Sequence, residues 1–123
     1  MPKHAAPGTV CVDWNGVLDT YQGWQGPDFT YPPREGVGEF LYALMQRGYH
    51  VIIYSSRKAD LIWHWLREND LDGFVSDVVS DCKPPAIAYI DDRGIRFEGD
   101  FGDVLIELDT FAREELPHWM HNT

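Results

Sequence analysis

Short apolar runs recur along the chain, and polar or turn-forming residues follow each of them. The first run, Thr9 to Val12, is rich in β-branched residues, which is typical of a strand buried on both faces in a parallel sheet. It stops at Asp13, and the Asn15-Gly16 pair then predicts a sharp turn. Similar runs predict four further strands, over 49–54, 74–79, 86–90 and, as a short edge strand, 95–97.

Between these runs, apolar residues recur at helical spacing. This spacing predicts helices over 35–47, where Gly48 supplies a left-handed stop, over 59–69 and over 104–115. In the second of these, His64 falls on the outer side and is expected at the surface. Strands that alternate with helices through short connections predict an α/β protein with right-handed crossovers. The expected architecture is a three-layer α/β/α sandwich around a Rossmann-like, mainly parallel sheet.

The composition is that of one compact domain. A chain of 123 residues with 44% hydrophobic residues is enough for one core and too short for two ordinary domains, so we expect a single domain over 1–123 with residues 1–8 as a flexible lead-in. Cys11, in the buried first strand, and Cys82 do not form a disulfide framework. Residues 1–8 lack the apolar core of a signal peptide, and no apolar run is long enough to cross a membrane. We therefore expect a cytoplasmic protein with no membrane partner.

The charge balance limits the partners further. Twenty acidic residues against ten basic ones give a formal net charge of -10, and this field repels long nucleic acid. An anionic substrate would need a metal ion or a local basic cluster, for which Arg57, Arg93 and Arg96 are candidates.

The stretch 19–33 differs from the rest of the chain. It places Tyr21, Trp24, Phe29 and Tyr31 among glycines and prolines, which favours an ordered loop over a helix. These aromatic residues either fold back onto the body as a satellite cluster, or wall a substrate entrance or an oligomer contact.

Polar residues follow three of the predicted strands. Because parallel strands end at one edge of a sheet, Asp13, Ser55 and Asp91 should converge there. Carboxylates about 4 Å apart repel by roughly 4 kcal/mol at an effective dielectric constant near 20, and a bound cation removes this cost. Oxygen ligands with positions left for water and phosphate are those that Mg²⁺ prefers.

Four short motifs stand in order between residues 9 and 92. The first is Asp13-Trp14-Asn15-Gly16-Val17-Leu18, the second is Ser55 or Ser56 after the apolar Val51-Ile52-Ile53, the third is Lys83 before Pro84, and the fourth is the apolar Ile87-Ala88-Tyr89-Ile90 followed by Asp91 and Asp92. Together they resemble the motifs of the haloacid dehalogenase (HAD) superfamily, whose first motif reads Asp-x-Asp-Gly-Thr/Val-Leu. The resemblance covers nearly the whole chain.

The resemblance implies an Mg²⁺-dependent hydrolase that acts on a phosphomonoester. Asp13 would attack the phosphoryl group and form an aspartyl phosphate. It would also bind Mg²⁺ together with the backbone carbonyl of Asn15 and the carboxylate of Asp91, and Asp92 would support the metal site.

The remaining motif residues would bind the phosphoryl group. Ser55, or alternatively Ser56, would donate a hydrogen bond to a phosphoryl oxygen, and Lys83 would neutralise charge and keep Asp13 ionised. Arg57 and Arg93 would contribute to substrate binding.

Asn15 departs from the family pattern. Most phosphatases of the superfamily have an Asp at this position, which protonates the leaving oxygen and then activates water, whereas an amide cannot transfer a proton at neutral pH. The alternative function is therefore a catalytically weak or inactive phosphate-binding or regulatory domain. A third reading makes His118 and His121 a metal site, against a solvated pair near the terminus.

The short spacing between the motifs leaves no room for a cap domain. An open site of this kind suggests a large substrate, such as a phosphoprotein or a nucleic-acid end, or else an oligomer. The expected partner is a phosphorylated substrate, either a small molecule or an exposed phosphate on a macromolecule. A large substrate would cover the site itself, and in a homo-oligomer a neighbouring copy would do so.

Overall fold

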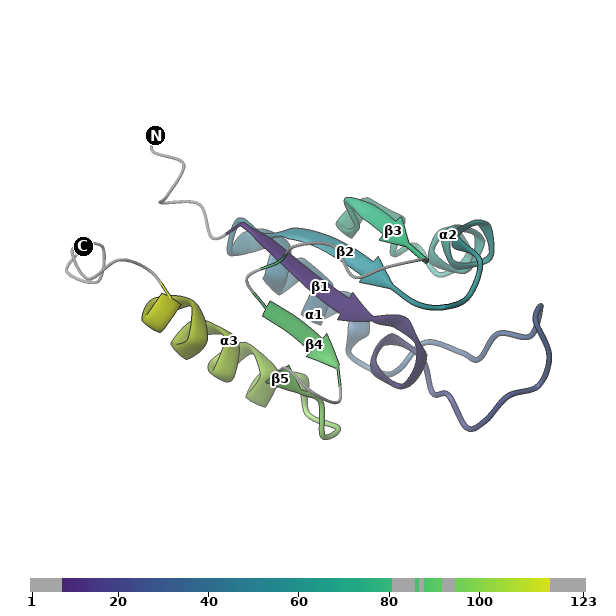
Figure 1. The fold of residues 1–123 in the computed structure, drawn as a ribbon, viewed down its shortest axis with the longest axis horizontal. Coiled ribbons are helices and arrows are strands. Elements are labelled where there is room, and N and C mark those ends of the chain that lie inside the picture. Colours follow the sequence, from purple (N-terminus) through teal and green to yellow (C-terminus); the bar gives the residue numbers. More distant parts are fainter. Residues whose placement is uncertain (1–7, 81–85, 87, 92–94, 116–123) are drawn as a thin grey trace.

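A computed structural model describes residues 8–80, 86, 88–91 and 95–115, of which 111–115 are described as backbone only (Figure 1). Within these ranges, five strands form one parallel sheet in the order β3-β2-β1-β4-β5. The strands are β1 (Thr9–Asp13), β2 (His50–Tyr54), β3 (Asp77–Val79), β4 (Ala88–Asp91) and β5 (Ile95–Arg96). The helices are α1 (Val37–Gln46), α2 (Ala59–Glu68) and α3 (Phe101–Glu115). The fold is therefore a Rossmann-like parallel α/β fold.

The central strand is β1, as its composition predicts. Val10, Cys11 and Val12 are all buried, which is the pattern of a strand covered on both faces. On one side Val12 pairs with Ile53 of β2, and on the other it pairs with Ile90 of β4. Asp13, the last residue of β1, therefore lies between the carboxyl ends of two neighbouring strands.

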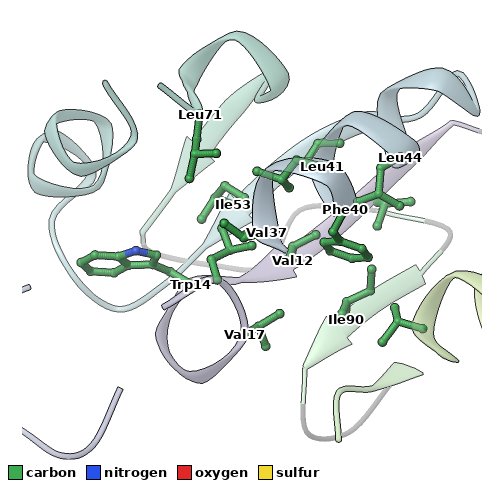
Figure 2. Close-up of a cluster of buried hydrophobic side chains, with 14 of the residues drawn as sticks. Val12, Trp14, Val17, Val37, Phe40, Leu41, Leu44, Ile53, Leu71 and Ile90 are labelled. Atoms are coloured by element: carbon green, nitrogen blue, oxygen red, sulfur yellow. The ribbon is translucent and has the colours of Figure 1, made fainter. Parts of the chain in front are cut away.

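The helices pack on this sheet through the apolar residues that the helical spacing identifies. α1 contacts β2 and α3, α2 contacts β3, and α3 contacts β4 and β5. Figure 2 shows side chains from α1, β1, β2 and β4 meeting in one buried cluster, with Trp14 at one end of it. His64 is exposed and lies 3.3 Å from Glu68, so its predicted surface position is confirmed.

A stack of aromatic rings joins α1 to α3. The ring of Phe40 stacks on that of Phe101 at 4.5 Å between centroids, and Phe101 stacks on Phe97 at 4.8 Å. The guanidinium of Arg34 lies 4.9 Å from the centroid of Phe97 and extends the stack toward the end of β1. Phe40 is therefore an anchor between two helices.

Most element bounds differ from the prediction by one or two residues, and three of the differences have a clear local cause. α1 begins at Val37 rather than at residue 35, because Gly36 has a φ of 85° that a right-handed helix cannot contain. The predicted strand over 74–79 is wrong in its first half, since Phe74 ends a 3-10 turn (Asp72–Phe74) and only Asp77–Val79 pair with β2. α3 begins at Phe101, before the predicted start, because the Asp100 carboxylate accepts the N–H groups of Gly102 and Asp103 and so caps the helix.

Some predictions fall on residues that the structure does not describe. These are the lead-in over residues 1–7, the polar position of Cys82, and the pair His118 and His121. Among the described helices, none is long and apolar enough to cross a membrane.

We expect the Phe40→Ala variant to lose about 3–5 kcal/mol of unfolding free energy. The change removes a buried ring together with its stacking contact on Phe101, and it leaves a cavity. Ile106→Ala on α3 is the matched control, since Ile106 is 67% exposed and its truncation should leave stability nearly unchanged. Chemical denaturation measures both variants. Equal midpoints for the two variants would contradict the anchoring role of Phe40.

Candidate active site at the carboxyl edge of the sheet

Three polar residues end adjacent strands of the sheet, as the sequence predicts. Asp13 is the last residue of β1, Ser55 directly follows β2, and Asp91 is the last residue of β4. In Figure 1 the arrows of these strands point the same way, toward the loop that follows β1. Such an edge is where ligands bind in open α/β sheets.

The two carboxylates are neighbours across the ladder. Val12 pairs with Ile90, so Asp13 and Asp91 each stand one residue beyond that pair and face the same side of the sheet. Neighbouring strands lie about 4.8 Å apart. Asp91 is buried and Asp13 is half-buried. This edge therefore concentrates negative charge in a region with little water.

The chain turns immediately after Asp13. Within the wide helical turn Trp14–Leu18, Asn15 has φ -71° and ψ 126° and Gly16 has φ 85° and ψ -13°, the angles of a type II turn. The second position of this turn requires a positive φ, which glycine adopts without strain. The Asn15-Gly16 pair thus forms the sharp turn that the sequence predicts, and the backbone reverses beside the candidate nucleophile.

A buried carboxylate holds this turn in place. Asp19 is fully buried (0% exposed). Its Oδ1 accepts the backbone N–H of Gly16 at 2.7 Å and that of Tyr21 at 3.1 Å, and its Oδ2 accepts the side-chain amide of Asn15 at 2.7 Å. Asn15, at the position where the family pattern has an acid, therefore donates a hydrogen bond to the carboxylate of Asp19.

The electrostatics of Asp19 combine opposing effects. Burial raises the pKa of the Asp19 carboxyl above its ordinary value, whereas the hydrogen bonds from Gly16, Asn15 and Tyr21 and the charge of Arg34 act in the opposite direction. Every hydrogen bond described at this carboxyl comes from an N–H donor, which is the arrangement that stabilises the ionised form.

Arg34 secures the other side of the turn. Its Nη2 donates to the carbonyl oxygen of Gly16 at 3.0 Å, and its backbone N–H donates to the carbonyl of Leu18 at 2.8 Å. Asp19 and Pro33 also form an isolated antiparallel bridge. Both the N–H and the C=O of Gly16 are therefore fixed by charged side chains, which defines the backbone beside Asp13.

The two candidate serines differ in exposure. Ser55 is buried, its backbone N–H donates to Val79, and its Oγ accepts the N–H of Arg57 at 3.1 Å. Ser56 is exposed. A hydroxyl that accepts one hydrogen bond can also donate one, so Ser55 keeps the capacity to bind a phosphoryl oxygen.

Arg57, the candidate anion-binding residue, contacts the aromatic loop 20–32. Its Nη2 lies within hydrogen-bonding distance of the carbonyl oxygens of Gly26 (3.3 Å), Pro27 (2.7 Å) and Phe29 (2.8 Å). These contacts give Arg57 a structural role that the sequence does not reveal, because it follows β2 and lies far from the loop in the chain. Its predicted part in substrate binding stays a prediction.

The same guanidinium lies between two indole rings. Its Cζ is 5.5 Å from the ring of Trp14 and 5.0 Å from the ring of Trp24. Trp14 is fully buried and packs edge-to-face on Trp65, whereas Trp24 is 63% exposed. Arg57 thereby links the buried core to the exposed tip of the loop.

The aromatic loop is ordered, as its composition predicts. At its base Thr20 donates its backbone N–H to Pro32, and the indole N–H of Trp65 donates to the carbonyl of Tyr31 at 2.7 Å. The ring of Tyr31 packs edge-to-face on Tyr21 and Phe29. The first of the two arrangements that the sequence allows, a satellite cluster, is present among these rings, and Tyr21, Trp24 and Phe29 remain partly exposed. In Figure 1 the loop lies at the end of the sheet where β1 ends.

Lys83, Asp92 and Arg93 lie outside the described residues, so their predicted roles remain predictions. Arg96 is on β5, where it pairs with Asp91 in register, and its exposed side chain lies 3.8 Å from Glu98.

The donor set at the edge fits Mg²⁺ in chemical type. Mg²⁺ binds through one or two carboxylates and retains several waters, and Asp13 and Asp91 supply two carboxylates on neighbouring strands. In the described part of the chain, no group of three or more His, Cys, Asp or Glu side chains gathers around one point. Among the described residues, further ligands would be backbone carbonyl oxygens, and the supporting role of Asp92 stays a prediction.

A hollow of about 240 Å³ lies beside the start of α3. Its lining carries four carboxylates and one guanidinium, and consists of Arg96, Glu98, Asp100, Asp103, Ile106 and Glu107. Neither Asp13, Ser55 nor Asp91 lines it, so this hollow is not part of the candidate site.

Sequence reasoning missed Asp19 and Arg34. Asp19 begins a loop rich in glycine and proline, a context that indicates an exposed polar residue. A usable signal was its spacing, since Asp19 stands three residues after the glycine of the Asn15-Gly16 turn and can accept N–H groups from it.

Comparison with known proteins adds no relative. No protein-family model, curated protein or solved structure matches the chain.

We expect the Arg57→Lys variant to loosen the loop 20–32 without unfolding the protein. Lysine keeps the charge but loses the planar fork that reaches several carbonyl oxygens, so backbone amides of the loop should exchange with solvent faster by on the order of tenfold. Hydrogen exchange resolved by residue measures this. Arg67→Lys on the exposed side of α2 is the matched control, and equal loop exchange in both variants would refute the anchoring role.

Proposed function

We propose that the chain is an Mg²⁺-dependent phosphatase-like hydrolase of the HAD superfamily, in which Asp13 is the nucleophile. The observation that carries the proposal is the position of Asp13 at the end of the central strand, beside Asp91 and ahead of a fixed type II turn. The order of the four sequence motifs supports it independently. We extend the proposal to a three-layer α/β/α sandwich without a cap domain.

The described connections support a capless arrangement. Between Leu18 and Ser55 the chain forms the aromatic loop, α1 and β2, and between Ser56 and Val79 it forms α2, the 3-10 turn and β3. Neither segment contains an inserted domain. A capless site favours a substrate that covers it, either a phosphate exposed on a macromolecule or a small molecule that the aromatic loop or a neighbouring copy encloses.

In the proposed reaction an oxygen of Asp13 attacks phosphorus, and the bond from phosphorus to the leaving oxygen breaks. Water then attacks the aspartyl phosphate, which releases phosphate and restores the carboxylate of Asp13. Asp13, Asp91 and the backbone carbonyl of Asn15 would hold Mg²⁺, which neutralises charge and aligns the nucleophile with phosphorus. Ser55 would donate a hydrogen bond to a phosphoryl oxygen.

A second candidate function is a phosphate-binding or regulatory domain with little or no turnover. The Asn15–Asp19 hydrogen bond favours it, because the side chain at the usual position of the proton donor is an amide bound to another residue. Turnover of p-nitrophenyl phosphate with Mg²⁺ and with EDTA separates the two functions. Hydrolysis that EDTA abolishes supports the enzyme, and phosphate binding without hydrolysis supports the regulatory domain.

We expect Asp13→Asn to reduce phosphatase activity by on the order of 10³-fold or more while the protein stays folded, because the change keeps the shape of the side chain and removes its nucleophilic charge. Steady-state kinetics and circular dichroism measure both properties. The control is Asp109→Asn, which removes the same charge from an exposed ion pair with Arg47, the residue after α1. Full activity in a folded Asp13→Asn protein would disprove covalent catalysis.

We expect millimolar Mg²⁺ to raise the melting temperature by several degrees, because a ligand that binds only the folded state stabilises it, by about 2.7 kcal/mol at 100 times its dissociation constant. Asp91→Asn should reduce this shift and Asp109→Asn should not. Thermal scans with increasing Mg²⁺, and with EDTA as the metal-free reference, measure these shifts. An unchanged shift in the Asp91→Asn variant would place the metal elsewhere.

A further inference from the structure

The side chains of Asn15 and Asp19 form a matched pair of donor and acceptor. One oxygen of the buried Asp19 carboxylate accepts the amide Nδ2 of Asn15 at 2.7 Å. The other oxygen accepts the backbone N–H of Gly16 within the turn and that of Tyr21 after it. Asp19 thus connects the side chain at position 15 to the backbone that shapes the turn.

This pairing restricts what position 15 can hold. An ionised carboxylate only accepts hydrogen bonds, so the group that faces Asp19 must be a donor. A second carboxylate at position 15 would face Asp19 at hydrogen-bonding distance in a buried setting, where like charges repel strongly. An amide satisfies the constraint, and this is the residue that the chain has.

We infer that Asp19 is a positioning residue that fixes Asn15 in the turn, and that positions 15 and 19 form one unit whose two side chains can be exchanged. The inference rests on the proposed function in one respect, namely that position 15 faces the leaving oxygen of the substrate. Asn15 is then the hydrogen-bond donor to Asp19, and its amide has a structural role of its own.

The pair also points to a class of substrate. With an amide at position 15, the side chain there cannot give the leaving oxygen a proton, so the site favours a leaving group that departs as an anion. Esters whose leaving group is a stable anion suit the site in this respect, as aryl and acyl phosphates do, whereas alkyl phosphates do not. We therefore assign aryl or acyl phosphates to this site.

The reciprocal variant Asn15→Asp/Asp19→Asn tests the pair directly. It keeps the net charge and the hydrogen bond but reverses its direction, since the amide of residue 19 then donates to the carboxylate of residue 15 while its oxygen still accepts from Gly16 and Tyr21. The set for comparison is the wild type, Asn15→Asp, Asp19→Asn, Asn15→Ala and the reciprocal variant. Asp109→Asn controls for the loss of one negative charge.

Melting temperatures measured without substrate or metal test the Asn15–Asp19 pairing independently of activity. We expect Asn15→Asp to melt lowest and the reciprocal variant to recover most of the loss. Asp19→Asn should melt between them, because Asn15 can turn its amide and offer its oxygen instead. If Asp19→Asn does not fold, Asn15→Ala decides, since removal of the donor should cost less than facing Asp19 with a charge. Independent, additive shifts, or an Asn15→Asp protein no less stable than Asn15→Ala, would overturn the pairing.

Kinetics test the chemical consequence. We compare kcat/KM on p-nitrophenyl phosphate and on ethyl phosphate. The reciprocal variant should gain about 10²–10⁴-fold on the ethyl ester, the usual effect of general acid catalysis, and much less on the aryl ester. An unchanged ratio between the two esters in a stable reciprocal variant would overturn the assignment of substrate class. If no protein of the set hydrolyses p-nitrophenyl phosphate, the proposed function fails, and the melting temperatures still decide the pairing.

Discussion

The buried carboxylate of Asp19 is the constraint on which the candidate site depends. A charge without water is costly unless N–H groups or opposite charges surround it. Here burial raises the pKa of the Asp19 carboxyl, and three hydrogen bonds and the nearby charge of Arg34 offset part of that effect. Because these donors belong to the turn after β1, the carboxylate is satisfied only when that turn has its observed shape. The electrostatic requirement of one side chain thereby fixes the backbone next to Asp13.

Packing of Arg34 on a stack of aromatic rings also supports the turn. Arg34 binds the carbonyl of Gly16 and stacks on Phe97, which continues through Phe101 to Phe40 of α1. The site is thus coupled to the contact between α1 and α3. On the other side, Arg57 fixes the aromatic loop against Trp14 of the core. Residues that bind or orient a ligand are most effective when such surrounding contacts restrict their motion.

Most of the architecture follows from the sequence, because apolar periodicity reports burial directly. Val10 and Val12 identify a fully buried strand, and the position of Asp13 at its end follows from parallel topology. The shortened β3 and the late start of α1 depend on local geometry at Phe74 and Gly36 that periodicity does not report. The support of the site was not predictable in the same way. Asp19 pairs with Pro33, and Arg57 meets carbonyl groups far away in the chain, so no local pattern marks either residue.

The order of the strands has a consequence for the way the chain folds. β1 comes first in the described chain, yet both of its partners come later, since Thr9 pairs with His50 and Val10 with Ala88. Contacts between distant segments require the chain to lose entropy before they stabilise it, which slows the folding of parallel sheets. During synthesis β1 can therefore pair with β2 first, and its second neighbour, β4, is added only when that later segment has been made. Asp13 and Asp91 meet only when β4 pairs with β1, so the charged edge of the sheet is completed only after β4 has joined.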